Sequence, residues 1–199
     1  MQRLIVYLVL TSALAACSGI PLRSIPRLLQ LQNELLNINP GEFMLAIQVD
    51  ARMTPPPGAA PTLHLAIRPG RPDAPDAFEA VERSLPMAVS NAAAPALGLA
   101  PAPAGRRWLI YSFPPAAQDE LARIQTRFKR LQTERRDQGG VSLALGIAQE
   151  GVATQDPALA HTRWESWLQT SQKKGFFELW SGAIADLLKQ AKDQAKAER

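Results

Sequence analysis

The feature of this chain that most constrains its fold is the alternation of apolar and polar residues in short runs. In residues 43–49 every second side chain is large and apolar, and residues 63–67 repeat the pattern. Successive side chains of a strand point to opposite faces of a sheet, so each run predicts a strand with one buried face. Because only a Pro-rich turn at residues 54–58 divides the runs, we expect them to pair as antiparallel neighbours.

Three further segments favour strands. Residues 106–113 are rich in aromatic and branched side chains and end at two prolines, and residues 141–147 form a short apolar run. Residues 77–89 fit neither the helical nor the strand period, and Pro86 excludes the centre of a sheet. We therefore expect an edge strand in residues 77–89.

Residues 116–137 predict the clearest helix, because large apolar side chains recur there in steps of three, four and three. Acidic residues in its first turns and arginines in its last complement the helix dipole. Shorter amphipathic segments predict helices at residues 26–38 and 183–191. The apolar stripe of the long helix consists of Leu121, Ile124, Phe128 and Leu131.

The segment 157–180 admits two interpretations. Asp156-Pro157 could start a helix that ends at Lys173-Lys174-Gly175. Alternatively, residues 164–171 and 176–180 are two aromatic-rich strands around a turn. We favour the hairpin, partly because of a resemblance described below.

Together these elements predict an α+β fold. We expect one domain, residues 26–188, with an antiparallel sheet of about six or seven strands, the long helix on one face, and short N- and C-terminal helices. Residues 91–105 contain mostly Ala, Pro and Gly without charge, which indicates an internal linker. The charged residues 189–199 predict a fraying tail.

The start of the chain predicts a signal peptide at residues 1–16. Its apolar run is shorter than the roughly 20 residues that span a bilayer, which argues against a permanent transmembrane anchor. An ordinary cleavable secretion signal is a better alternative interpretation than a transmembrane anchor. However, Ala13-Leu14-Ala15 supplies only part of the small-residue pattern that such a signal has before its cleavage site. Cys17, the only cysteine, follows directly and has no partner for an internal disulfide, so stability must come from the core.

Leu14-Ala15-Ala16-Cys17 resembles the lipobox of bacterial lipoproteins. The resemblance implies that the leader is cut before Cys17, that its thiol is diacylated and that the new amino terminus is acylated. Several acyl chains give stable anchoring, so membrane lipid is the implied partner and residues 17–25 are the lipidated tether. Ser18 is similar to the sorting signal for the outer membrane, which implies a location in the cell envelope facing the periplasm.

The rest of the chain resembles, loosely, a group of uncharacterised proteobacterial proteins of unknown function. The corresponding segments of that group look like strands, which supports the hairpin, but the resemblance implies no activity. The Ala/Pro-rich linker and the C-terminal tail depart from the group. The shared features are the run from Gly105 to Tyr111, an Arg-rich helix, a Gly-rich stop, Ser142 to Gly146, Trp167 to Ser171, and Gly175-Phe176.

The sequence predicts no catalytic residue, metal site or cofactor. Lys and Arg number 22 against 18 Asp and Glu, a mild excess that does not predict a nucleic-acid partner. His64 and His161 lie far apart, without the ligand spacing of a zinc site. The chain also lacks a Gly-x-Ser-x-Gly motif and a glycine loop that opens a helix.

Two groups of residues are candidates for an interaction surface. Arg123, Arg127 and Arg130 share one ridge of the long helix, which suits an anionic partner, with an ordinary solvated face as the alternative. An aromatic group near the C-terminus predicts either core packing or an exposed patch for a partner. Its members are Trp164, Trp167, Phe176, Phe177 and Trp180.

We expect from these features a membrane-anchored lipoprotein of the bacterial cell envelope. Its leading predicted role is that of a non-catalytic interaction module for an envelope protein. A binder of a lipid or another apolar ligand is the alternative, because a mostly apolar pocket between sheet and helices is compatible with this composition. An enzyme is the least favoured of the three.

Overall fold

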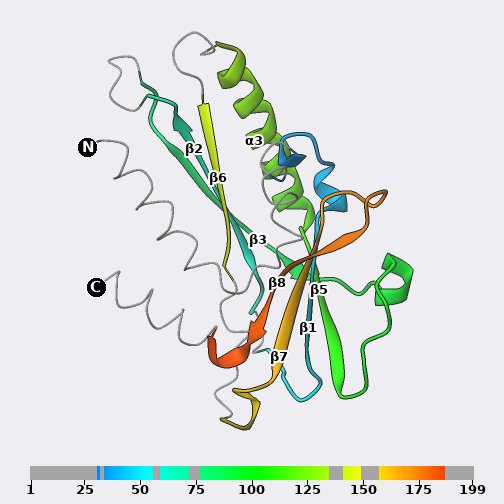
Figure 1. Ribbon diagram of the computed structural model, residues 1–199. Coiled ribbons are helices and arrows are strands. Elements are labelled where there is room, and N and C mark those ends of the chain that lie inside the picture. The colour runs from blue at the N-terminus through cyan, green and yellow to red at the C-terminus, as the bar shows by residue number, and fades with distance from the viewer. Residues whose placement is uncertain are drawn as a thin grey trace, which may run out of the picture.

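Two antiparallel sheets and one long helix make up the part of the chain that the computed structural model describes (Figure 1), which is residue 31 and residues 34–55, 59–71, 77–134, 141–148 and 157–186. One sheet has the strand order β4-β5-β1-β7-β8 and the other β3-β2-β6. The elements are β1 (Met44–Asp50), β2 (Thr62–Pro69), β3 (Val81–Pro86), β4 (Ala88–Val89), β5 (Arg106–Ser112), α3 (Pro115–Glu134), β6 (Val141–Ala148), β7 (Arg163–Gln169) and β8 (Phe176–Ala183), with short 3-10 helices η2 (Pro40–Glu42), η3 (Ala94–Leu97) and η5 (Pro157–Leu159).

Several sequence predictions lie outside the described residues. These are the signal peptide, Cys17, the tether and the tail at residues 189–199. Of the helix expected at residues 26–38, only residues 31, 34 and 35 are described as helical, and of the C-terminal helix only residues 184–186.

The α+β class and the antiparallel strands are confirmed, but the single sheet of six or seven strands is wrong. The described residues form a five-stranded and a three-stranded sheet. The chain passes from one sheet to the other at Met87, between β3 and β4. Pro86 is the last residue of β3, and one further bond in the same register runs from the Met87 N–H to the Pro61 carbonyl at 2.9 Å. Pro61 has no N–H to return a bond, so the pairing with β2 goes no further. The edge strand expected in residues 77–89 is present as β3, at the edge of its sheet.

The expected pairing of the first two strands is also wrong. β1 lies between β5 and β7, whereas β2 lies between β3 and β6. A two-residue turn fixes strand register, but a long Pro-rich connection does not, so burial decides the partners. β1 has its first six residues buried and therefore takes a central position covered on both faces.

Helix α3 joins the two sheets into one core. Pro115 occupies its first position, where the missing N–H costs no helical bond, and Gln118 donates its side-chain amide to the Phe113 carbonyl at 2.8 Å. In Figure 1 the helix runs alongside the three-stranded sheet. Its predicted stripe is buried in one cluster with inner residues of both sheets, and the helical members of that cluster are Ala117, Leu121, Ile124, Phe128 and Leu131.

The hairpin β7–β8 is confirmed over the helical alternative. Its turn ends at Gly175, whose φ of 67° is the left-handed conformation that glycine adopts without strain. Ser166 pairs with Trp180 and the next residue pairs with Glu178, so Leu179 is an extra residue that bulges into the core. The buried Ser166 hydroxyl accepts from the Trp180 N–H at 3.2 Å and donates to its carbonyl at 3.3 Å, which satisfies the backbone at the bulge.

The substitution Leu121→Ala tests whether α3 holds the core together. Leu121 is fully buried, so we expect a loss of about 2–5 kcal/mol in the free energy of unfolding, measured by urea denaturation with tryptophan fluorescence. The matched control is Thr126→Ala, on the exposed side of α3, where the hydroxyl donates only to the Ala122 carbonyl. The control should change stability by less than about 0.5 kcal/mol. Equal effects of the two substitutions would contradict the proposed packing.

The turn after β1 makes a prediction about pH. Arg52 donates side-chain and backbone hydrogen bonds to Asp50, which lowers the pKa of that carboxyl from 3.8 to about 2. The lower pKa in the folded chain means that this contribution to stability is complete above pH 3.8 and is lost as pH falls through about 2. We expect Arg52→Gln to raise the Asp50 pKa, as measured by carboxyl-carbon NMR titration. An unchanged titration midpoint in the variant would refute this assignment.

Candidate interaction surfaces

The outer side of the five-stranded sheet, opposite the core that contains α3, carries a second and smaller apolar cluster. Its buried members are Met44, Ala46, Leu99 and Ile110, and three larger aromatic side chains pack on them while staying partly exposed. We call Trp108, Trp167 and Phe176 the outer aromatic face.

Strand register explains how the outer aromatic face is assembled. Ala46 on β1 lies opposite Ile110 of β5 on one side and Trp167 of β7 on the other. The small alanine leaves room for the large indole, and Trp108 and Trp167 meet edge to face with ring centroids 6.3 Å apart. Phe176 enters from β8, paired with Gln169. Four neighbouring strands therefore contribute to this face.

The Ala/Pro-rich segment at residues 91–105 covers one side of the outer aromatic face. It carries the 3-10 helix η3 and ends that helix at Gly98, whose φ is 77°. Leu99 is only 6% exposed, and the Trp108 indole N–H donates to the Ala100 carbonyl at 2.9 Å. The segment that its composition predicts as a linker thus also packs on the sheet, because its leucine reaches the outer cluster.

Polar groups border the outer aromatic face at both ends. Arg106 makes an ion pair of 2.8 Å with Glu165 and also donates to the backbone carbonyls of Gln48 and Arg163. At the other end Gln169 donates its side-chain amide to the Glu42 carbonyl at 3.0 Å. An apolar centre within a polar border is the usual composition of a protein interface.

The predicted aromatic group is divided between two sides of the hairpin. Trp164 is 7% exposed and belongs to the main core, and Phe177 and Trp180 pack against that core. Only Trp167 and Phe176 belong to the outer aromatic face. Trp108 also belongs to it and is absent from the predicted group. The sequence predicts that Trp108 lies on one face of the strand 106–113, but no local pattern indicates that β1 pairs with both β5 and β7.

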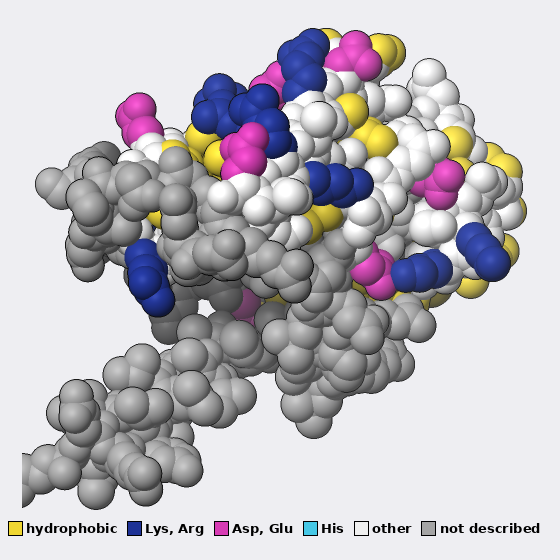
Figure 2. Space-filling view, turned by 90° about the horizontal axis from the view of Figure 1, so that it is seen from above, with side chains coloured by type: hydrophobic (Ala, Val, Ile, Leu, Met, Phe, Trp, Pro, Cys, Tyr) yellow, Lys and Arg dark blue, Asp and Glu magenta, His cyan; other side chains and the backbone are white. Residues whose placement is uncertain are grey.

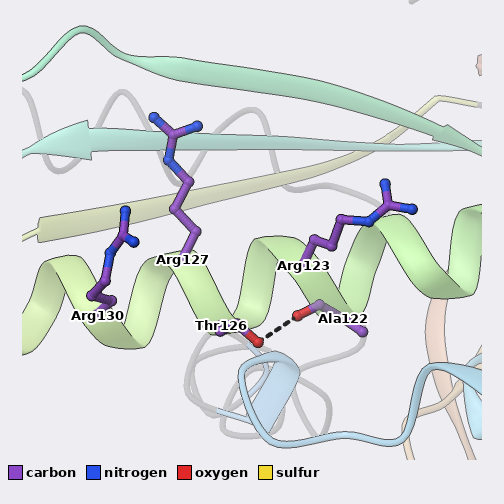
Figure 3. Close-up of a pocket in the computed structure, with 5 residues that line it drawn as sticks. All are labelled: Ala122, Arg123, Thr126, Arg127 and Arg130. Carbon is purple, nitrogen blue, oxygen red and sulfur yellow. Dashed lines mark hydrogen bonds between the residues drawn. The ribbon is translucent and has the colours of Figure 1, made fainter.

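The predicted arginine ridge is present on the exposed side of α3. Arg123, Arg127 and Arg130 are all exposed and line an open depression of about 460 Å³ together with Ala122 and Thr126. The close-up in Figure 3 shows the three arginine side chains leaving the same side of the helix. We call these three residues the arginine ridge.

The outer side of the three-stranded sheet holds a polar depression of about 320 Å³ around His64. The Ser84 hydroxyl lies 2.9 Å from His64 Nδ1, and Arg68 pairs with Glu82 at 3.1 Å. Nucleophilic catalysis also needs a group that orients the histidine and donors for an oxyanion. No carboxylate among the described residues bonds to His64, so the pair lacks the orienting group of a triad.

A third depression, of about 560 Å³, lies where the N-terminal helical residues meet the β7–β8 turn. Glu34 accepts from Lys174 at 2.6 Å and from Thr170 at 3.1 Å, and Glu42 accepts from the Gln172 N–H at 2.9 Å. These charged groups satisfy one another, so the depression is best explained as a structural junction.

Within the described residues no group of three or more His, Cys, Asp or Glu side chains is placed to hold a metal ion. His161 lies exposed just before β7, and His64 lies on β2. No helix in the described ranges combines the length and apolar character that a membrane span requires.

Comparisons with known proteins give no relative of this chain. No family model, curated protein or solved structure matches the chain.

Proposed function

We propose that the protein is a lipoprotein of the bacterial cell envelope, held through acyl chains on Cys17 at the outer membrane facing the periplasm, and that it is a non-catalytic interaction module. The outer aromatic face would bind an envelope protein. The observation that carries this proposal is the pair of partly exposed tryptophans, Trp108 and Trp167, at the centre of an apolar sheet face with a polar border.

Composition supports a protein as the occupant of this face. Tryptophan and arginine are enriched where interfaces derive most of their binding energy, and charged residues are depleted from interface centres. Here the indoles lie centrally, and Arg106 and Glu165 are bound to each other at the border. We infer a partner surface with aliphatic or aromatic side chains at its centre and polar groups around them.

The rigidity of the face also favours binding. Its three aromatic residues lie on β5, β7 and β8. Backbone hydrogen bonds hold β5 and β7 in register with β1, and β8 in register with β7. Side chains that are already ordered lose less conformational entropy on association. The hydrogen bond from Trp108 to Ala100 fixes one of the two indoles before any partner arrives.

The alternative, a binder of an apolar ligand, has less support. Sites for such ligands are concave and mostly apolar. The depressions described above are open and lined by charged or polar side chains, and the space between the sheets and α3 is filled by the main core.

Substitution of the cysteine tests the anchor. We expect Cys17→Ser to abolish incorporation of labelled palmitate and to leave the leader uncut, because the hydroxyl cannot replace the thiol in acyl transfer. Mass spectrometry of the amino terminus and metabolic labelling would measure both effects. Ser18→Ala is the matched control and should mature normally. Normal maturation and acylation of the Cys17→Ser protein would refute the anchoring.

Site-specific photocrosslinking tests the outer aromatic face. Benzoylphenylalanine in place of Phe176 preserves an aromatic ring there, and the control position is Val89, which is 69% exposed at the edge strand β4. In cells we expect one discrete protein adduct from position 176 and none of that mass from position 89.

Binding of the isolated partner completes this test. We expect Phe176→Glu to weaken the affinity at least about tenfold, equivalent to about 1.4 kcal/mol, because it places a charge in an apolar interface centre. Val89→Glu should leave the affinity unchanged. Equal adducts from both positions, or an unchanged affinity of a folded Phe176→Glu protein, would exclude the outer aromatic face as the binding surface.

A further inference from the structure

The arginine ridge is a surface that the proposed protein interaction does not use. Arg123 and Arg130, at its two ends, have side chains that are 72% and 68% exposed. At 1.5 Å per helical residue the ridge extends about 10 Å along α3. Figure 2 looks down on the end of the molecule where α3 lies in Figure 1, and it shows Lys and Arg side chains gathered beside Asp and Glu side chains.

The charges at the two ends of the ridge are partly neutralised within the protein. Glu120 accepts from Arg123 at 2.5 Å and lies 3.4 Å from Arg83 of β3. Glu134 lies 3.6 Å from Arg130. Arg127, between them, makes no ion pair with any described residue. Among these described side chains, four guanidinium groups face two carboxylates, which leaves a net positive charge of two.

The shape of the ridge suits a broad anionic surface. Ala122 and Thr126, which line the same depression beside the arginines, have short side chains, and the threonine hydroxyl is already bonded to the alanine carbonyl at 3.0 Å. The arginine side chains extend beyond these short side chains (Figure 3), and Arg127 can reach anionic oxygens without first breaking an ion pair to a described residue.

We propose that the arginine ridge contacts anionic lipid headgroups of the membrane that holds the protein, and so orients the domain on that membrane. This inference rests on the proposed anchoring through Cys17. Residues 18–33 separate the cysteine from the continuous described chain and reach at most about 55 Å when extended, so headgroups stay accessible to the domain. An acidic protein surface is the competing occupant.

The expected size of the electrostatic effect supports orientation of an anchored domain rather than recruitment of a free protein to the membrane. One basic side chain near an anionic membrane surface shifts an equilibrium by about fivefold. That is too little to bring a free protein to a membrane. It is enough to bias the orientation of a domain that the anchor already holds at a high effective concentration of headgroups.

Arginine-selective modification of the acylated full-length protein in lipid nanodiscs tests the inference. One nanodisc contains phosphatidylcholine alone, and the other contains phosphatidylcholine with phosphatidylglycerol. We expect phenylglyoxal, read out by mass spectrometry, to modify Arg127 about fivefold more slowly in the anionic nanodisc. High salt should remove this protection, because the screening length falls to about 3 Å at 1 M.

Two controls identify the source of the protection. Arg163 is exposed at the start of β7, at the opposite end of the molecule from the end of α3 in Figure 1, and its modification rate should not depend on the lipid. The substitution Arg127→Gln should remove the lipid-dependent protection of Arg130, whereas Arg163→Gln should retain it.

The outcomes separate this inference from the anchoring itself. If the protein co-elutes with both nanodiscs but phenylglyoxal modifies Arg127 at the same rate in each, the proposed lipid contact is wrong and the proposed anchoring is unaffected. Equal protection by inorganic phosphate with neutral nanodiscs also overturns it, because the ridge would then be a site for free anions. Protection that requires an added acidic envelope protein assigns the ridge to that protein instead. Failure of the protein to co-elute with either nanodisc refutes the anchoring and the inference together.

Discussion

The burial of one stripe of α3 in a core that also contains the inner faces of both sheets is the constraint on which the rest of the structure depends. Leu121 and Phe128 belong to the same buried cluster as Leu45 of the five-stranded sheet and Leu65 of the three-stranded sheet. A helix can bury only one stripe, so this packing forces the opposite ridge of α3 to face solvent. It also covers only the inner face of the five-stranded sheet. The positions of the arginine ridge and of the outer aromatic face both follow from this contact.

The outer aromatic face depends further on the central position of β1. A strand paired on both sides brings β5 and β7 within reach of each other across a single small residue, Ala46. Only this arrangement lets Trp108 and Trp167 contact, although they are distant in the chain. The second buried cluster explains why the alternation in residues 43–49 predicts one buried face whereas β1 has two. Alternation of apolar and polar residues predicts only one buried face, and here residues 94–100 cover part of the outer side of the five-stranded sheet as well.

Local patterns in the sequence predict the elements of this fold far better than their partners. Alternation and helical periodicity identify β1, β2 and α3, because these signals depend on nearby residues. Lys173-Lys174-Gly175 is compatible with a helix end as well as with the hairpin turn, so the local pattern alone did not decide between them. No local pattern predicts that the strands divide into two sheets or that the chain passes from one sheet to the other at Met87. Both features depend on burial between segments that are distant in the sequence. The same holds for the candidate surfaces. The spacing of Arg123, Arg127 and Arg130 predicts their common ridge, whereas membership of Trp108 in the outer aromatic face requires knowledge of strand order.

The two surfaces lie on different elements: the arginine ridge is on the exposed side of α3, whose buried stripe joins the main core, and the outer aromatic face is on the side of the five-stranded sheet that faces away from that core. In the proposed arrangement this geometry has a functional consequence. If the arginine ridge rests on anionic headgroups, the surface of the domain that meets the lipid is the exposed side of α3 and not the outer aromatic face. A partner could then dock without competing with the bilayer for the same apolar side chains. A weak ionic contact on one side would in this way determine which side of a tethered domain is available for protein binding.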